Sequence, residues 1–393
     1  MNVLFVNYHD FSSNSAIHIF NFANQLINMD VDCKVFVPNN KKSIQLIGKA
    51  KFEVFDFADF RKKKIEFQDG RNPDIIHAWT PREIVRGFTQ KLTDFYGCKY
   101  IVHLEDNEEA IVRKRYGIDT ELMKSLPEKI LNRIIDKQFS HPTRFRGFLE
   151  KADGITVIID KLLELKPPQI KGKVIWPGYE EEKFSPRPVD IELRTKLGIN
   201  EKSFVIVYTG NVHPSNKKEV YSLYLAIAAL NRKGISVKLV RTGRDFVDFH
   251  DDATDSAREF YIELGFVDRE VLPNIMSLSD IFVQPGASDE FNDYRFPSKL
   301  PEFFAMSKPV ILPSTNIGRY LMDGYNCLLL EKGDAFEICE KLEFVFNNMD
   351  RSRIIGKEGR EFATKNFSWS INTKALYDFY VDVIENDTQS WRK

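Results

Sequence analysis

The chain has 393 residues, of which 43% are hydrophobic and 29% charged. These proportions exclude a disordered or fibrous protein, and the length favours two domains over one core. A formal net charge of −1 excludes the strong positive field expected of a nucleic-acid-binding protein.

The cysteines and the N-terminal residues bear on the cellular compartment. Cys33, Cys98, Cys327 and Cys339 are scattered, without a CxxC pair or metal-type spacing, and are typical of buried thiols in a reducing compartment. The opening MNVLFVNYHD lacks the charged and apolar regions of a signal peptide. No apolar run approaches the roughly 20 residues of a membrane span. We therefore predict a cytoplasmic protein.

In the first half, short apolar runs alternate with helical patterns. One such pattern places Ile17, Phe20, Ala23, Leu26 and Ile27 at spacings of three and four residues. The predicted strands are Asn2–Asn7, Cys33–Pro38, Phe52–Phe55, Pro73–Ala78, Lys99–His103, Gly154–Ile159 and Lys173–Trp176. Strands that are apolar on both faces and alternate with helices predict a parallel sheet covered by helices. We expect an α/β, doubly wound domain over residues 1–180.

Residues 111–151 are rich in lysine and arginine. An apolar stripe of Leu131, Ile134 and Ile135 lies among these cations. One interpretation is a solvated helical face. The other is a surface that meets anionic lipid or an acidic acceptor, which would place the protein at the inner face of the membrane.

A segment rich in proline and glutamate, Pro177–Pro188, predicts an interdomain linker. Beyond it the strand pattern resumes, with predicted strands Phe204–Thr209, Val237–Thr242, Ile262–Phe266, Ile281–Gln284, Val310–Pro313 and Cys327–Leu330. This indicates a second doubly wound domain over residues 181–370. A C-terminal helical segment, 371–393, follows. Two such domains would face each other across a cleft, where ligands commonly bind.

The most informative stretch is Asp289–Val310, which leads from a buried strand through a polar loop into a short helix. In open α/β sheets, ligands bind beyond the carboxyl ends of the strands. The unpaired N–H groups of a helix start suit phosphate, Lys299 adds positive charge, and Glu302 offers an acceptor for hydroxyl groups. Together they suit a nucleotide sugar.

A second phosphate-binding candidate follows the predicted strand Phe204–Thr209. The turn at Gly210 and Asn211 leads to Lys217 and Lys218 at the start of a helix, where an ammonium group and backbone donors would act together on an anion.

Taken in order, several segments resemble those of a known enzyme family. The segments are PDIIHAWT, KVIWPGYEEEKFSP, VYTGN, NKKEVYSLYLAIAAL, FVDREVLPNIMSLSDIFVQPG, FPSKLPEFFAMSKPVILPS, DGYNCLLL and NFSW. With them the chain resembles, over nearly its whole length, retaining glycosyltransferases of the GT-B fold in family 4, which includes sucrose synthase-like and lipopolysaccharide-type enzymes. In that family the C-terminal helix commonly crosses back to the first domain.

The resemblance implies roles for individual residues. Glu302 matches the glutamate that binds the ribose hydroxyls of the donor, Lys217 the lysine that holds the diphosphate, and His103 a histidine that faces the donor sugar. We expect these three to be catalytic. The donor-binding candidates are Gly210, Asn211, Lys218, Tyr294, Arg295, Pro297, Ser298 and Lys299.

Two positions depart from the family pattern. Asn211 stands where the family has an arginine, and Tyr294 stands in place of a glutamate eight residues before Glu302. Arg295 and Lys299 could replace part of the lost positive charge.

The resemblance implies hexosyl transfer with retention of configuration, from a nucleotide-diphosphate sugar to a glycan or lipid-linked acceptor, in surface polysaccharide or glycolipid synthesis. No metal or other cofactor is expected. Asn211 and Tyr294 motivate an alternative, a non-catalytic subunit that binds nucleotide sugars. A GT-B epimerase that acts on the sugar nucleotide is a third hypothesis.

Overall fold

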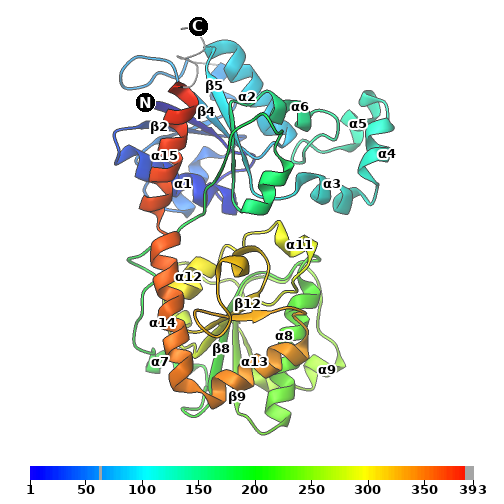
Figure 1. The fold of residues 1–393 in the computed structure, drawn as a ribbon, viewed down its shortest axis with the longest axis vertical. Coiled ribbons are helices and arrows are strands. Elements are labelled where there is room, and N and C mark those ends of the chain that lie inside the picture. Colours follow the sequence, from blue (N-terminus) through cyan, green and yellow to red (C-terminus); the bar gives the residue numbers. More distant parts are fainter. Residues whose placement is uncertain (62–63, 386–393) are drawn as a thin grey trace. The chain divides into compact units, whose positions relative to one another are not determined.

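The computed structural model describes residues 1–61 and 64–385. The chain divides into two compact units (Figure 1). Unit 1 contains Met1–Pro177 and the chain from Trp369 onward, and unit 2 is Gly178–Ser368. Of the predicted linker Pro177–Pro188, Pro177 belongs to unit 1 and the remaining residues begin unit 2. Residues 386–393 of the predicted C-terminal segment lie outside the described residues.

Unit 1 is built on a seven-stranded sheet with the order β3-β2-β1-β4-β5-β6-β7. Its strands are β1 (Asn2–Val6), β2 (Asp32–Val37), β3 (Glu53–Asp56), β4 (Ile75–Trp79), β5 (Lys99–Leu104), β6 (Gly154–Val157) and β7 (Gly172–Val174). All neighbouring pairs are parallel. Every residue of β1 and β4 is buried, because helices cover both faces of the sheet.

The helices of unit 1 follow the strands along the chain. They are α1 (Asn14–Ile27), α2 (Glu83–Tyr96), α3 (Glu108–Tyr116), α4 (Thr120–Ser125), α5 (Glu128–Ile134), α6 (Phe145–Glu150) and α15 (Trp369–Glu385), with 3-10 turns at Lys41–Leu46, Asp59–Arg61 and Asp160–Leu165. The fully buried side of α1 carries Ile19, Phe22 and Leu26. Ile17 and Phe20, which the sequence pattern placed on that side, are only partly buried.

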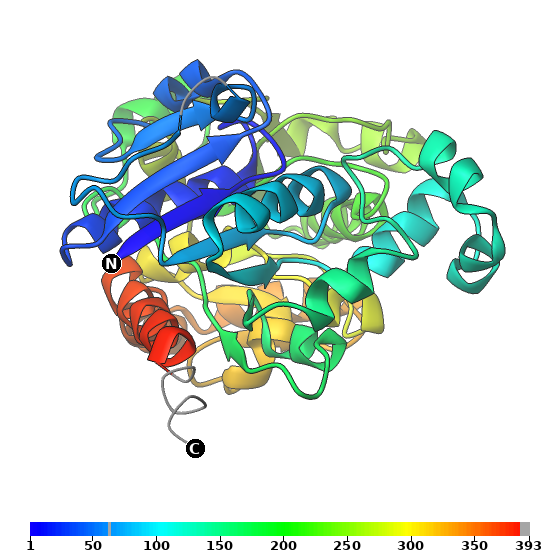
Figure 2. The same cartoon turned by 90° about the horizontal axis from the view of Figure 1, so that it is seen from above.

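The C-terminal helix α15 packs beside α1, as Figures 1 and 2 both show. Its buried side carries Leu376, Phe379 and Tyr380, which join the same apolar cluster as the inner face of α1. The Tyr380 hydroxyl lies 2.7 Å from Nδ1 of His77 on β4. A polar contact in the apolar core thus fixes α15 on the sheet of unit 1.

Helices α3 to α5 project from the rest of unit 1 (Figures 1 and 2). They enclose a small core of their own, which contains Leu131 and Ile135 together with Val112 and Met123. The apolar stripe expected in this segment is therefore not one exposed face, and only its member Ile134 is exposed. Leu131 and Ile135, four residues apart, face this core together, whereas Ile134, the last residue of α5, faces away from it.

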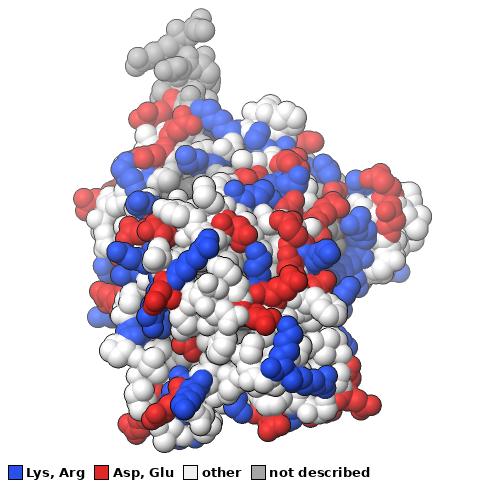
Figure 3. Space-filling model, turned by 60° about the horizontal axis from the view of Figure 1, so that its bottom comes forward, with Lys and Arg blue, Asp and Glu red and all other residues white. Residues whose placement is uncertain are grey.

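Several cations of this basic segment are paired with acids. Arg146 pairs with Glu109 at 2.7 Å, and Arg144 pairs with Glu83 and Glu128 at 3.0 Å. None of the helices formed by residues 1–61 and 64–385 is long and apolar enough to span a membrane. On the face drawn in Figure 3, cationic and anionic side chains are interspersed.

Unit 2 contains a six-stranded sheet with the order β10-β9-β8-β11-β12-β13, again with parallel neighbours. Its strands are β8 (Phe204–Thr209), β9 (Val237–Thr242), β10 (Tyr261–Glu263), β11 (Ile281–Val283), β12 (Val310–Pro313) and β13 (Leu328–Leu330). The strand predicted over Ile262–Phe266 ends early, at Glu263. The chain turns there because Gly265 adopts a left-handed backbone conformation, with φ of 65°.

The helices of unit 2 are α7 (Ile191–Lys196), α8 (Lys217–Arg232), α9 (Asp252–Asp255), α10 (Leu272–Ser277), α11 (Glu290–Asp293), α12 (Leu300–Ala305), α13 (Ala335–Asn347) and α14 (Met349–Asn366), with 3-10 turns at Arg258–Phe260 and Asn316–Tyr320. The chain winds from β8 to one side through β9 and β10, and to the other through β11 to β13. The order of winding reverses between β8 and β11. In such sheets the carboxyl ends at the reversal form a ligand crevice.

Tyr380→Phe should lower the free energy of unfolding of unit 1 by about 1–3 kcal/mol, because His77 Nδ1 would lose its buried partner. The described tryptophans, Trp79, Trp176 and Trp369, all lie in unit 1, so their fluorescence during urea denaturation follows this unit. Tyr377→Phe on the same helix is the control and should change little. Equal effects of the two variants would show that the Tyr380–His77 contact is unimportant.

Candidate functional site

Three glycines lie side by side at the carboxyl edge of the unit 2 sheet. Gly210 follows β8, Gly243 follows β9 and Gly265 follows β10. The N–H of Gly210 donates to Thr242 O at 3.0 Å, and that of Gly243 donates to Gly265 O at 2.7 Å. A Cβ on Gly243 would lie 2.3 Å from Gly210 O, so only glycine allows this approach. Gly210 thus lies at the β8 side of the reversal, where the absence of a Cβ lets other side chains approach its backbone.

Lys299, the residue that precedes α12, lies against the first of these glycines, Gly210. A Cβ on Gly210 would be 2.8 Å from Lys299 Nζ, and the ammonium group lies 5.0 Å from the centre of the Tyr208 ring. Burial, together with the nearby charge of Arg295, lowers the pKa of Lys299 to about 8. The protein therefore holds a partly desolvated cation at the position where β8 ends, as an anion-binding site requires.

Glu302 lies in the first turn of α12 and is 8% exposed. Its Oε1 accepts a hydrogen bond from Arg269 Nη2 at 2.7 Å, and Arg269 Nε donates to Glu180 at 2.6 Å. The guanidinium also lies 5.2 Å from the centre of the Phe184 ring. Burial raises the pKa of Glu302, and the charge of Arg269 opposes that shift. Arg269 thereby connects two carboxylates and orients Glu302.

Glu219 is a second acid at this site, contributed by the first turn of α8. Its Oε1 accepts a hydrogen bond from Asn292 Nδ2 at 2.9 Å. Burial raises its pKa, while the Asn292 hydrogen bond and the charges of Arg295 and Lys299 lower it. Glu219 is thus the carboxylate that faces the cations of the Arg295–Lys299 segment.

The beginning of α8 is exposed. The side chain of its N-cap residue, Asn216, makes no capping hydrogen bond. It is used in the turn instead, where it accepts from His213 N at 2.8 Å and donates to Asn211 O at 2.9 Å. Lys217 and Lys218 are both exposed, and neither has an ion-pair partner within the described residues. This helix start therefore offers backbone donors and two ammonium groups to a ligand.

The remaining donor-binding candidates lie in the same unit with different surroundings. The Asn211 side chain accepts from Arg244 N at 2.8 Å, so it fixes the loop after β9. Tyr294 ends α11 and is partly buried, and Arg295 lies 4.8 Å from the centre of the Phe291 ring. Ser298 is exposed, whereas Pro297 is partly buried and accepts from Leu300 N at 3.0 Å.

His103 lies in unit 1, on β5, and is 1% exposed. Its Nδ1 is 2.8 Å from Thr156 Oγ1, and its ring stacks on Trp79 at a centroid distance of 4.0 Å. Burial lowers its pKa to about 3, so the ring is neutral at physiological pH. Nε2 is buried and has no hydrogen-bond partner among the described residues.

Close to His103, Glu105 is the centre of a polar cluster that sequence reasoning did not identify. It accepts hydrogen bonds from Trp79 Nε1 at 2.8 Å and from Ser15, and His18 Nδ1 lies 3.0 Å from it. Although burial raises the pKa of Glu105, the hydrogen bond and charge of His18 hold it at about 2. The Glu105 carboxylate is therefore ionised, and its contacts with Ser15, His18 and Trp79 fix its position.

Within residues 1–61 and 64–385, no group of three or more His, Cys, Asp or Glu side chains could hold a metal ion. The cationic side chains at the unit 2 site are Lys217, Lys218, Arg269, Arg295 and Lys299.

Comparison with known proteins agrees with this geometry. Residues 203–348, which include the carboxyl edge of the unit 2 sheet, match the family model described as "Glycosyl transferases group 1". The structure aligns with HepE of Anabaena, crystallised with UDP-glucose, at a TM-score of 0.70, over 97% of this chain and 100% of that one. The fold is the GT-B fold. Because identity to HepE is 14%, this likeness concerns the fold alone.

Two curated proteins are related in sequence. The chain is 27% identical over 146 residues to the uncharacterised glycosyltransferase MJ1178 of Methanocaldococcus jannaschii, covering 37% of this chain and 40% of that protein. It is 25% identical over 219 residues to EpsD of Bacillus subtilis, a provisionally named glycosyltransferase, covering 54% of this chain and 55% of EpsD. The chain therefore matches only about half the length of these relatives or less.

Lys299→Met should stabilise unit 2 at pH 7, because a cation whose pKa is lowered to about 8 by folding opposes folding while it stays charged. The expected gain is about 2 kcal/mol, on the basis of roughly 1.4 kcal/mol per pKa unit reduced for partial exposure. It should be complete below pH 8 and disappear near the usual lysine pKa of about 10.4.

Differential scanning calorimetry at several pH values measures this gain, with the exposed Lys218→Met as the control. A gain that persisted at high pH would show that Lys299 acts through packing and not through its charge.

Proposed function

We propose that this GT-B protein is a retaining glycosyltransferase. It transfers a hexosyl group from a nucleotide-diphosphate sugar to a glycan or lipid-linked acceptor, in the synthesis of a surface polysaccharide or glycolipid. One observation carries the proposal: the Lys299 ammonium group lies on the backbone of Gly210 at the end of β8, and Glu302 is buried three residues further along, in the first turn of α12. Such groups lower stability, so their presence together beyond the carboxyl end of β8 supports a ligand site.

In this proposal Glu302 binds the ribose of the donor. Within the described part of the chain Arg269 donates to Glu302 through Oε1 only, which leaves Oε2 to accept from ribose hydroxyls. Arg269 is a positioning residue, because it fixes the carboxylate and its charge opposes the rise in pKa that burial causes. A hydrogen bond to a charged acceptor contributes about 1.5–3 kcal/mol, so Glu302 supplies a substantial part of donor affinity.

The diphosphate is bound by cations and backbone donors. The N–H groups at the start of α8, with Lys217, face one side of the phosphates, and Lys299 lies at the β8 end. As the bond between the sugar C1 and the phosphate oxygen breaks, negative charge grows on the leaving group. Fixed positive groups stabilise that charge, and the loss of one such group typically slows enzymes 10²–10³-fold.

Retention follows if the acceptor attacks from the side on which the phosphate leaves. The acceptor oxygen then forms its bond to C1 while its proton passes to the departing phosphate oxygen. No covalent nucleophile, metal or cofactor takes part in this scheme. Glu219 supplies an acid to the site even though Tyr294 stands where the resembled family has a glutamate. We propose that Glu219 orients hydroxyl groups of the donor sugar.

Glu302→Gln and Lys217→Ala should weaken the reaction in different ways. Glu302→Gln loses the charged ribose acceptor, so UDP affinity should fall roughly tenfold. Lys217→Ala should lower kcat about 10²-fold with a smaller change in UDP affinity, because its charge acts mainly on the leaving group. Calorimetric titration with UDP and steady-state assays separate the two effects. Full activity in both variants would contradict the site.

A non-catalytic nucleotide-sugar-binding subunit is the second candidate function. Asn211 is uncharged, and its side chain accepts a hydrogen bond from Arg244 N. The site therefore lacks the cation that the resembled family has at this position. Assays with a panel of nucleotide sugars and lipid or glycan acceptors discriminate between the two functions. Turnover of any donor supports the enzyme, whereas tight binding without turnover or hydrolysis across the panel supports the binding subunit.

A further inference from the structure

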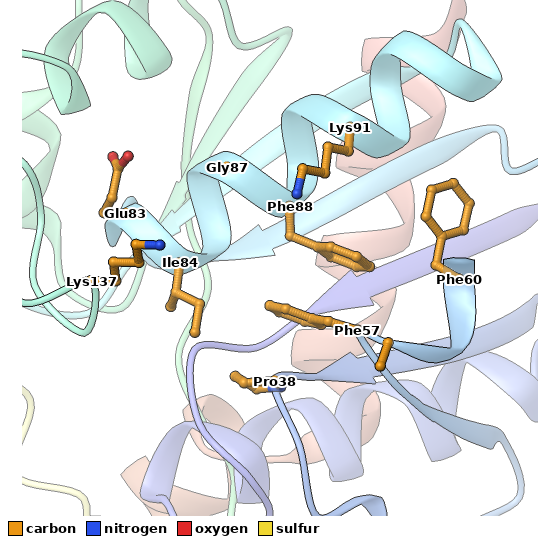
Figure 4. A pocket seen from close by; sticks show the side chains of 10 residues that line it. Pro38, Phe57, Phe60, Glu83, Ile84, Gly87, Phe88, Lys91 and Lys137 are labelled. Carbon is orange, nitrogen blue, oxygen red and sulfur yellow. The ribbon is translucent and has the colours of Figure 1, made fainter. Parts of the chain in front are cut away.

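A pocket of about 420 Å³ opens in unit 1, at the carboxyl ends of β2 and β3 beside the first turns of α2 (Figure 4). This volume lies in the range of small-molecule sites, roughly 300–1,000 Å³. Pro38, Phe57, Phe60, Ile84 and Phe88 make most of its lining apolar. Neither the site of unit 2 nor the cluster around Glu105 shares a lining residue with it.

The floor of the pocket is an aromatic platform. The rings of Phe57 and Phe88 lie face to face (Figure 4). Their centroids are 3.9 Å apart and their planes are inclined by 5°. Phe60 meets Phe88 edge-on at 6.0 Å, and Phe36 supports Phe88 from the core at 5.0 Å. Because Phe88 is 6% exposed and packed on three rings, the apolar surface is preformed. A preformed apolar surface binds an apolar ligand with little ordering cost.

The rim of the pocket is positive. Lys137 lies beside Ile84 and Lys91 beside Phe88 (Figure 4), and both lysines are exposed. Neither pairs with an acid among residues 1–61 and 64–385. The pocket's acid, Glu83, is neutralised by Arg86 at 2.7 Å and Arg144 at 3.0 Å.

The N–H groups of the first two residues of α2 are not available to an anion at the rim. The N–H groups of Glu83 and Ile84 donate to Phe139 O and Lys137 O, at 3.0 and 2.9 Å. An anion at the rim would therefore meet the two lysine side chains. The apolar lining, in turn, offers a free sugar few hydrogen-bond partners.

We infer that this pocket binds an apolar chain that ends in a phosphate group. The chain would lie on the Phe57–Phe88 platform, and the phosphate would be bound by Lys91 and Lys137. Such a compound is the lipid part of a lipid-linked acceptor, so this assignment of the acceptor class rests on the proposed function. The binding site itself is tested without any donor.

Geranyl phosphate, below its micelle concentration, is the probe, and calorimetric titration of the full chain is the measurement. Geranyl phosphate should bind at least tenfold more tightly than geraniol, because geraniol lacks the anion. Inorganic phosphate alone should bind at least tenfold more weakly than geranyl phosphate, because it lacks the chain.

Gly87→Leu tests the location. Gly87 lines the pocket within α2, and a Cβ there would have no atom within 4 Å, so a larger side chain fits and occupies the pocket. Geranyl phosphate affinity should fall at least tenfold. The matched control is Gly147→Leu, in α6, which is equally open but does not line the pocket and should bind normally.

The double variant Lys91→Gln/Lys137→Gln tests the charge. It should reduce the affinity for geranyl phosphate to that for geraniol and leave geraniol binding unchanged. A matched double variant of exposed lysines in unit 2, Lys196→Gln/Lys202→Gln, should retain full affinity for geranyl phosphate.

Each contrary result overturns a defined part of the proposal. Equal binding of geraniol and geranyl phosphate overturns the phosphate assignment, and unchanged binding by a folded Gly87→Leu overturns the location. Absence of geranyl phosphate binding in a preparation that still binds UDP overturns the pocket proposal but leaves the proposed function intact. Binding of geranyl phosphate without turnover of any donor supports the pocket and contradicts the proposed function.

Discussion

The geometry of the unit 2 site depends on Arg269, which holds two carboxylates. Its guanidinium connects Glu180, in the first residues of unit 2, to Glu302 on α12, with contacts of 2.6 and 2.7 Å. Without a cation between them, burial and mutual repulsion would favour protonation of one carboxylate. Arg269 therefore does two things at once. It fixes the beginning of unit 2 to the helix of the site, and its charge lowers the pKa of Glu302 against the larger effect of burial.

The same site contains charges that cost stability. Lys299 has its pKa lowered to about 8, and Glu219 and Glu302 have theirs raised, in each case with burial as the largest cause. A structural ion-pair network would normally shift these pKa values in the opposite directions. The arrangement is understandable if a ligand with phosphate and hydroxyl groups replaces the missing solvation. The proposed nucleotide-sugar donor carries both kinds of group.

The sequence predicted the fold well because the strands are short apolar runs in a regular alternation with helices. The limits of β8, β9 and β12 were predicted to the residue. Local patterns failed where backbone conformation or tertiary packing decides. Gly265 ends β10 early, and Leu131 and Ile135 are buried in a core that α3 to α5 make for themselves.

The candidate site was only partly predictable for a similar reason. Lys299 and Glu302 lie in one stretch of the sequence, so a local pattern was enough to bring both into the predicted site. Arg269 and Glu219 were missed, because their partners Glu302 and Asn292 are distant in sequence. The sequence offered one signal for each: Arg269 lies in the polar turn after Gly265, and Glu219 lies in the first turn of α8.

A crystal structure of the chain with UDP tests the central claim most directly. We predict that the diphosphate contacts the start of α8, Lys217 and Lys299, that it lies over Gly210, and that the ribose hydroxyls donate to Glu302 while Arg269 stays in place. A nucleotide bound elsewhere, or a ribose that does not contact Glu302, would contradict the account.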